Sequence, residues 1–180
     1  MDLRTGIETR RSIRSYTDQP VTEEQIRQIV SAAQPAPSWK NSQTARYYAV
    51  LDKNLKERIA AEATMQFSKN MNNIRNAAAL VVLASKTGIA GYDPDGSFTT
   101  PLGTHWQSFD AGIACQTFCL AAHDLGLGTL IMGIFDPEKV AELAGLASDE
   151  QAAALIAVGY PASDPSAPAR KPLNEVLTIR

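Results

Sequence analysis

Residues 105–125 constrain the fold most, because they predict one long helix with apolar side chains almost all round. Small side chains recur along the segment, at Ala111, Gly112, Ala114, Ala121 and Ala122. A helix without a polar face must be buried on every side. The segment therefore predicts a helix that is either central in the fold or packed against a second subunit.

The rest of the chain mixes expected helices and strands. The apolar run AAALVVLA at residues 77–84 predicts a strand that is buried on both faces. Shorter strands are expected at residues 47–51, 129–135, 153–160 and 176–180. Amphipathic spacing predicts helices at residues 2–10, 22–33, 54–65 and from residue 136 onward. Because the two types do not alternate regularly, we expect an α+β fold rather than a doubly wound sheet.

Composition narrows the class of protein. A chain of 180 residues is expected to form a single domain, residues 1–180, around one sizeable core. Its net charge of -2 argues against a general nucleic-acid binder. No stretch approaches the ~20 uncharged apolar residues of a membrane helix. The N-terminus lacks the apolar core of a signal peptide, so we expect a cytoplasmic protein. Cys115 and Cys119 are expected to be buried apolar side chains rather than a redox pair or half a metal site.

A cluster of arginines near the N-terminus is the first candidate for a binding site. Arg10, Arg11, Ser12 and Arg14 lie at the end of the first expected helix. Arginine supplies the bidentate, charge-assisted donors that suit a phosphate ester. Taken alone, however, a solvated basic turn after a helix explains this segment better.

A polar loop before the first expected strand is the second candidate. Amide side chains pair a donor with an acceptor, which suits the polar edge of a heterocycle. A plain Asx-type turn between helix and strand is the simpler explanation of the loop on its own. The candidate residues are Pro37, Ser38, Trp39, Asn41 and Gln43.

Glycines after the long helix are the third candidate. Gly126 and Gly128 do not match a dinucleotide-binding motif, because a strand rather than a helix is expected to follow them. Gly133 is harder to explain, since glycine weakens a strand and often marks a close backbone approach to a ligand. A second basic pair, Arg170 and Lys171, follows a Pro-rich linker at residues 161–169 and could join the first cluster.

These segments occur together in an order that resembles the nitroreductase family of FMN-dependent enzymes. The resemblance rests on five motifs: Arg10 to Arg14 after a helix, the loop from Pro37 to Gln43, DAGIACQTFCLAAHDLGLGT at residues 110–129, Met-Gly-x-Phe-Asp at 132–136, and Arg-Lys-Pro-Leu-x-Glu-Val at 170–176. Together they span essentially the whole chain.

The resemblance implies an α+β sandwich, with a central mostly antiparallel sheet flanked by helices, that forms an intertwined homodimer. FMN would lie at the subunit interface. Arg10, Arg11, Ser12 and Arg170 would hold its phosphate, with Lys171 adjoining. Arg14 would reach the N1/O2 edge, where a cation stabilises the anionic reduced flavin. Pro37, Ser38 and Asn41, with Gln43, would come from the other subunit, and the ring would lie near Leu130, Ile131, Met132 and Gly133.

The implied chemistry has two steps: NADH or NADPH gives a hydride to flavin N5 and leaves, and a small-molecule electron acceptor takes its place. Such transfer needs positioning and exclusion of water more than an acid or base, and no catalytic residue is singled out. Thr44 and Ala45 stand where many relatives carry Pro-Trp, and Met132 stands where some carry glutamate. The acceptor, whether a nitroaromatic, a quinone or a flavin, therefore stays open.

Three rival hypotheses fit nearly the same residues. The chain could be a flavin carrier or sensor without turnover. It could be an enzyme that fragments flavin or dehydrogenates a bound substrate. It could also be an anion-binding module that takes no flavin.

Overall fold

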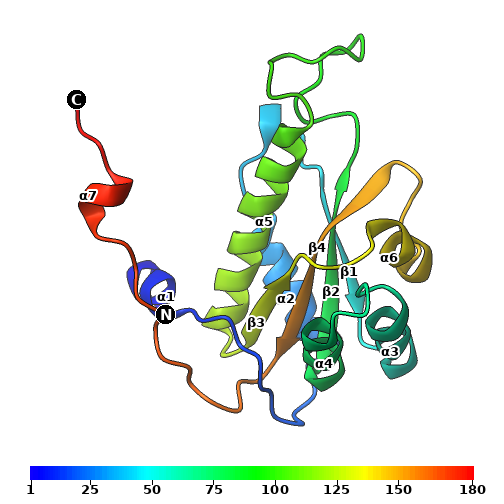
Figure 1. The fold of residues 1–180 in the computed structure, drawn as a ribbon, viewed down its shortest axis with the longest axis vertical. Helices are drawn as coiled ribbons and strands as arrows, with labels where there is room; N and C mark the ends of the chain where they lie inside the picture. Colours follow the sequence, from blue (N-terminus) through cyan, green and yellow to red (C-terminus); the bar gives the residue numbers. More distant parts are fainter.

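The computed structural model describes residues 1–180 and contains one antiparallel sheet with helices on both faces (Figure 1). The strand order is β1 (Ala45–Val50), β2 (Ala79–Lys86), β4 (Glu150–Gly159) and β3 (Gly128–Met132). Each neighbouring pair is antiparallel. The predicted α+β class with a mainly antiparallel sheet is therefore confirmed.

Two apolar layers sandwich the sheet. Helices α2 (Glu23–Ala33) and α5 (His105–Asp124) cover one face, where Phe118 packs with the sheet residue Val81. The other face is covered by α3 (Lys53–Glu62), α4 (Ser68–Asn76) and α6 (Pro137–Ala144). The central strand β2 is buried from Ala79 to Ser85, as its continuous apolar sequence predicts.

Local sequence signals set the starts of two helices. The Thr22 hydroxyl accepts from the Gln25 backbone N–H over 3.2 Å, and the Gln25 side chain accepts from the Thr22 backbone N–H over 3.0 Å. This reciprocal capping box begins α2. The Asp136 carboxylate caps α6, with Pro137 in the first turn. Helix α1 (Leu3–Thr9) also forms where the sequence predicts it.

Three elements differ from expectation. Helix α4 was not predicted, because its sequence SKNMNNIRN is polar and only Ile74 and Asn70 are buried along it. Strand β3 ends at Met132, where its pairing with Leu155 of β4 stops. The strand expected at residues 176–180 is wrong: α7 (Leu173–Val176) occupies its start, and the following residues are exposed.

Helix α5 is buried on only one side within a single chain. Asp110, Ala111, Cys115, Phe118 and Cys119 face the core, and both cysteines are free. On the opposite side, the Phe109 side chain is 60% exposed. The complete burial that the sequence predicts is therefore not achieved by one chain alone.

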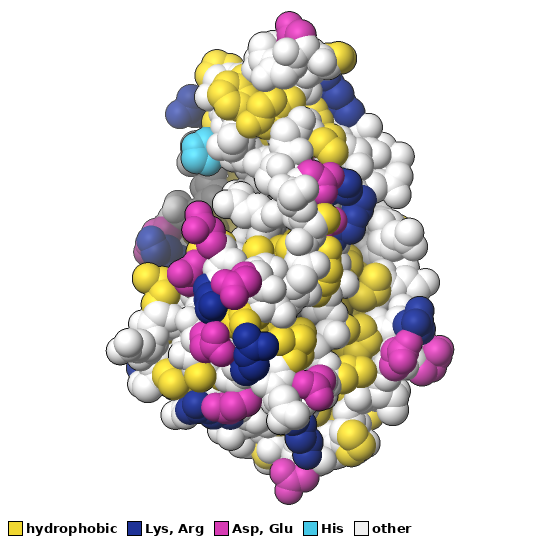
Figure 2. Space-filling view, turned by 90° about the vertical axis from the view of Figure 1, so that its right-hand side faces the viewer, with side chains coloured by type: hydrophobic (Ala, Val, Ile, Leu, Met, Phe, Trp, Pro, Cys, Tyr) yellow, Lys and Arg dark blue, Asp and Glu magenta, His cyan; other side chains and the backbone are white.

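One face of the molecule carries mixed surface charges. The face that carries α3 and α6 mixes acidic and basic side chains, many of them close together (Figure 2). Within α3, Arg58 pairs with Glu62, and Arg75 of α4 pairs with Glu57 of α3. The chain beyond Pro161 passes α1 and extends away from the sheet (Figure 1). None of the helices has the length and apolarity needed to cross a bilayer.

Candidate functional site

The arginine segment lies along the free edge of the sheet. The backbone N–H of Ile13 donates to the Thr129 carbonyl over 2.9 Å, and Ser12 forms a parallel bridge with Thr129 of β3. A Cβ atom at Gly128 would lie 2.4 Å from Ile13 Cγ1, so only glycine permits this approach without movement. These contacts fix Ser12 and Ile13, at the centre of the arginine segment, against β3.

A hollow of about 650 Å³ opens beside Arg10 and Arg11. The Arg11 guanidinium donates to the carbonyls of Glu8 over 2.8 Å and of Arg10 over 2.9 Å, which caps α1. Arg10 is a half-buried residue, and its guanidinium makes no hydrogen bond or ion pair with another residue. Its donors are therefore available to an anion in the hollow.

The electrostatic character of this first hollow is positive. Burial, followed by the nearby charges of Arg10 and Arg11, lowers the pKa of His123. The Nε2 atom of His123 lies 2.9 Å from the Thr9 hydroxyl. Asp164 also lines the hollow and partly offsets the two arginines. The neutral form of His123 is thus favoured beside two fixed cations.

A second hollow, of about 560 Å³, follows along the same strand edge. It brings Arg14 together with Leu130, Ile131, Met132 and Gly133. Arg14 donates only to the Ser12 carbonyl, over 3.3 Å, and pairs with no carboxylate. The edge of β3 therefore presents a cation beside each of two consecutive hollows.

Helix α4 forms the far wall of the second hollow. Asn70 donates to the Ile134 carbonyl over 2.9 Å, which holds α4 against the chain after β3. Lys69, Asn72 and Asn73 line the cavity beside it. Sequence reasoning missed these residues, because it did not predict α4. The run of asparagines in NMNNIRN was the available signal, since amide side chains suit a heterocycle edge.

The polar loop from Pro37 to Gln43 has an unusual backbone. Three residues of the loop have a left-handed backbone, with φ of 46° at Lys40, 55° at Asn41 and 50° at Gln43. Residues other than glycine rarely adopt this conformation. The Ser38 hydroxyl accepts from the Gln43 backbone N–H over 2.9 Å and closes the loop. Left-handed conformations of this kind persist where surrounding contacts impose them, often at functional sites.

Contacts with α5 anchor this loop. The Trp39 ring packs against Trp106 with centroids 4.6 Å apart. The Trp39 backbone N–H donates to the Asp110 carboxylate over 2.8 Å. Burial raises the pKa of Asp110, and the Trp39 hydrogen bond opposes the rise. Asp110 is a residue that sequence reasoning missed, because nothing in the sequence places it opposite the loop.

The loop and the arginines are not brought together within one chain. Pro37, Ser38 and Gln43 line a third hollow, of about 330 Å³, which shares no residue with the hollows along β3. Arg170 and Lys171 lie in the exposed tail and line none of the three. Arg170 donates to the Pro168 carbonyl over 3.3 Å, and Lys171 Nζ lies 3.8 Å from a Glu175 carboxylate oxygen.

Comparison with known proteins assigns this arrangement to a family. The sequence model of the nitroreductase family matches residues 7–160. The chain belongs to the nitroreductase family. The matched range contains the arginine segment, the polar loop and β3, and it stops before the exposed tail.

Individual members of the nitroreductase family resemble most of the chain. An FMN reductase [NAD(P)H] from Bacillus subtilis is 32% identical over 179 residues, which cover 92% of this chain and 68% of the relative. A nitroreductase family protein from Streptococcus pneumoniae has the same fold, with a TM-score of 0.86, 21% identity and coverage of 99% and 100%. A Desulfovibrio desulfuricans structure in complex with FMN has a TM-score of 0.79, 28% identity and coverage of 100% and 97%.

Proposed function

We propose that this chain is an FMN-dependent oxidoreductase that takes a hydride from NADH or NADPH and reduces a small-molecule acceptor of the nitroaromatic, quinone or flavin type. The observation that carries the proposal is the unpaired guanidinium of Arg10, a half-buried residue that lines a hollow beside β3. Family membership supports it, and so does the name of the Bacillus subtilis relative.

The phosphate of FMN is proposed to occupy the first hollow. Arg10 is the principal ligand, because its donors have no partner within the chain. Arg11 and Ser12 flank it, and Arg170 with Lys171 can reach it only if the tail changes its course or belongs to another subunit. A phosphate fits this hollow, since two guanidinium groups line it and one of them is already held in place by α1.

The flavin ring is proposed to lie over the second hollow. Arg14 is positioned to stabilise negative charge at the edge of the ring, and residues 130–133 line the hollow beside it. Asn73 and Lys69 offer further polar contacts from α4. The two hollows follow one another along β3, so a ligand with a phosphate at one end and a ring at the other suits them.

A homodimer is proposed to complete each site. The open side of α5, with Phe109 exposed, is the surface that a second copy would cover. Pro37, Ser38, Trp39, Asn41 and Gln43 would then be contributed to the flavin by the partner. This arrangement accounts for why the loop lines a hollow of its own within one chain. The nicotinamide donors are cytoplasmic metabolites, so we also propose a cytoplasmic location.

The chemistry demands positioning more than proton transfer. Bound FMN supplies a ring that accepts a hydride from a nicotinamide and passes two electrons to an acceptor. The chain contributes cations at the phosphate and at the ring edge, and walls that restrict water. Hydride transfer of this kind requires no side chain to act as an acid or base.

Reduction of the flavin by nicotinamides tests the proposal. Purified protein loaded with FMN should lose flavin absorbance when NADH or NADPH is added without oxygen, and should regain it when a quinone or nitroaromatic is supplied. A carrier or sensor would retain FMN but would not bleach with either nucleotide. Protein that takes up no FMN would contradict the whole proposal.

A further inference from the structure

Arg46 links the exit of the polar loop to the sheet. Its Nη1 atom donates to the Gln43 carbonyl over 2.9 Å and to the Ala45 carbonyl over 2.8 Å. Gln43 has a left-handed backbone, with φ of 50°, which is an unfavourable conformation for a residue other than glycine. Arg46 therefore holds the carbonyl of a loop residue whose left-handed conformation depends on such restraints.

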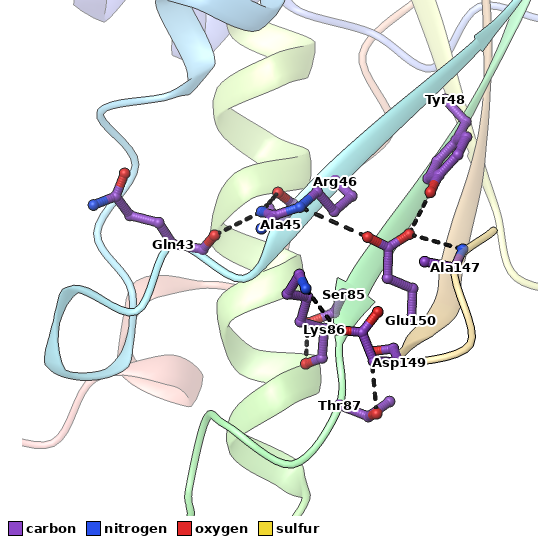
Figure 3. Close-up of polar contacts among 10 residues, drawn as sticks. All are labelled: Gln43, Ala45, Arg46, Tyr48, Ser85, Lys86, Thr87, Ala147, Asp149 and Glu150. Carbon is purple, nitrogen blue, oxygen red and sulfur yellow. Dashed lines mark hydrogen bonds and ion pairs between the residues drawn. The ribbon is translucent and has the colours of Figure 1, made fainter.

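Glu150 in turn holds Arg46 from two strands away (Figure 3). Arg46 Nε lies 3.7 Å from Glu150 Oε1, and the Glu150 side chain is only 5% exposed. The Tyr48 hydroxyl donates to the second carboxylate oxygen, and the Ala147 backbone N–H donates to it over 3.4 Å. A buried carboxylate is costly without such partners. Glu150 is thus a fixed anchor that restricts where the guanidinium can lie.

We infer that Arg46 and Glu150 are positioning residues that set the shape of the loop from Pro37 to Gln43 and, through it, the affinity for FMN. The last part rests on the proposed function, because the loop matters for FMN only if it contacts the cofactor. The loop is held at its entrance by Asp110, through the Trp39 backbone N–H, and at its exit by Arg46. Neither Arg46 nor Glu150 needs to touch the flavin.

The neighbouring ion pair provides a matched control. Lys86 Nζ lies 2.5 Å from Asp149, beside the Arg46–Glu150 pair (Figure 3). The Lys86 side chain makes no hydrogen bond or ion pair with the polar loop, and its backbone N–H donates to the Thr44 carbonyl, which the substitution leaves in place. Lys86→Ala therefore removes a neighbouring ion pair while both Arg46 hydrogen bonds at the loop exit remain.

The two tryptophans report on the loop without any flavin. Trp39 lies in the loop and Trp106 in α5, and the chain contains no other tryptophan. Arg46→Ala should change the near-ultraviolet circular dichroism of this packed pair, whereas Lys86→Ala should leave it as in wild type. Arg46→Lys should restore the signal in part, because an ammonium group can still bond one carbonyl. An unchanged signal in Arg46→Ala would overturn the positioning role.

Measuring the affinity for FMN tests whether the shape of the polar loop affects cofactor binding. Arg46→Ala should raise the dissociation constant for FMN about tenfold, the effect expected when a charge-assisted hydrogen bond that orders a contact is lost. Arg46→Lys should fall in between, and Lys86→Ala should match wild type. If Arg46→Ala does not fold, Tyr48→Phe, which removes one anchor of Glu150, should give a smaller change in the same direction. Equal affinity in all folded variants would overturn the link to FMN, whereas absence of FMN binding by wild type would overturn the proposed function itself.

Discussion

The backbone N–H of Trp39 donates to the carboxylate of Asp110 over 2.8 Å and ties the polar loop to the long helix α5. Asp110 is only 5% exposed, and the hydrogen bond from Trp39 links this buried carboxylate to the polar loop. This bond and the Arg46 contacts lie at opposite ends of the loop. A loop with left-handed residues is thus restrained from both sides.

Asp110→Asn should make the stability of the folded state depend less on pH. Burial raises the pKa of Asp110 above its ordinary value of 3.8, so the folded state holds the proton more tightly than the unfolded state. The raised pKa therefore contributes stability to the folded state below pH 3.8, where Asp110 is protonated. That contribution is lost as the pH rises through the pKa of Asp110 in the folded state. Asparagine keeps an acceptor for the Trp39 N–H without the charge.

Urea unfolding of wild type and Asp110→Asn from about pH 4 to pH 7 measures this difference. The variant should gain stability relative to wild type as the pH rises, and should be at least as stable at pH 7. A stability difference that is the same at every pH would show that the Asp110 charge does not matter.

Arg10→Ala should weaken FMN binding by about ten- to a hundredfold, because hydrogen bonds to charged groups contribute roughly 1.5–3 kcal/mol. Arg4→Ala is the matched control, since Arg4 lies in α1 just before Arg10, pairs with Glu8 and has a side chain that is 86% exposed. Titration of FMN into each protein, followed by quenching of flavin fluorescence, gives the two constants. If both variants bind FMN as wild type does, the phosphate assignment is wrong.

Two glycines beside the arginines should respond differently to alanine. At Gly128 a Cβ atom would lie 2.4 Å from Ile13 Cγ1, so Gly128→Ala should destabilise the fold by about 1–3 kcal/mol through overpacking. At Gly133 a Cβ atom would meet nothing within 4 Å, so Gly133→Ala should leave stability within about 0.5 kcal/mol of wild type.

Gly133→Ala should nevertheless weaken FMN binding, because the added methyl group enters the hollow proposed for the ring. Thermal unfolding and FMN titration of the same samples separate the two effects. Unchanged FMN affinity in Gly133→Ala would argue that the ring lies elsewhere.

Phe109→Asp should convert the proposed dimer into a monomer. Phe109 is 60% exposed on the open side of α5, beside a shallow hollow lined by Ser108, Gly112, Ile113 and Gln116. A buried charge at a subunit contact disfavours association strongly. Light scattering should give half the wild-type mass, and FMN affinity should fall in parallel because the partner's loop is lost.

Met65→Asp places the same charge at a residue that is 67% exposed and lies outside α5. Its mass and its affinity for FMN should match those of wild type. A monomeric wild-type protein that still binds FMN tightly would contradict the shared site.

Local sequence predicted the elements whose signals lie within a few residues of one another. The capping box of Thr22 and Gln25 and the capping of α6 by Asp136 are examples, because both are made inside one helical turn. The apolar run of β2 predicted its own burial, since each of its side chains must avoid water wherever the strand lies. Helix α4 escaped prediction because its polar sequence depends on tertiary contacts such as that of Asn70 with Ile134.

The arginines, the polar loop and the glycines could be identified as candidates from the sequence, because their chemistry belongs to the side chains and to the backbone freedom of glycine. Which of these candidates lie close together could not be predicted from the sequence. Only the tertiary structure decides that residues 10–14 lie along β3, that Arg10 has no partner while Arg11 caps a helix, and that Glu150 restrains a loop more than a hundred positions earlier through Arg46. These relations arise from contacts between segments far apart in sequence, whose geometry is set by how the whole sheet and its two helical layers pack rather than by any local pattern.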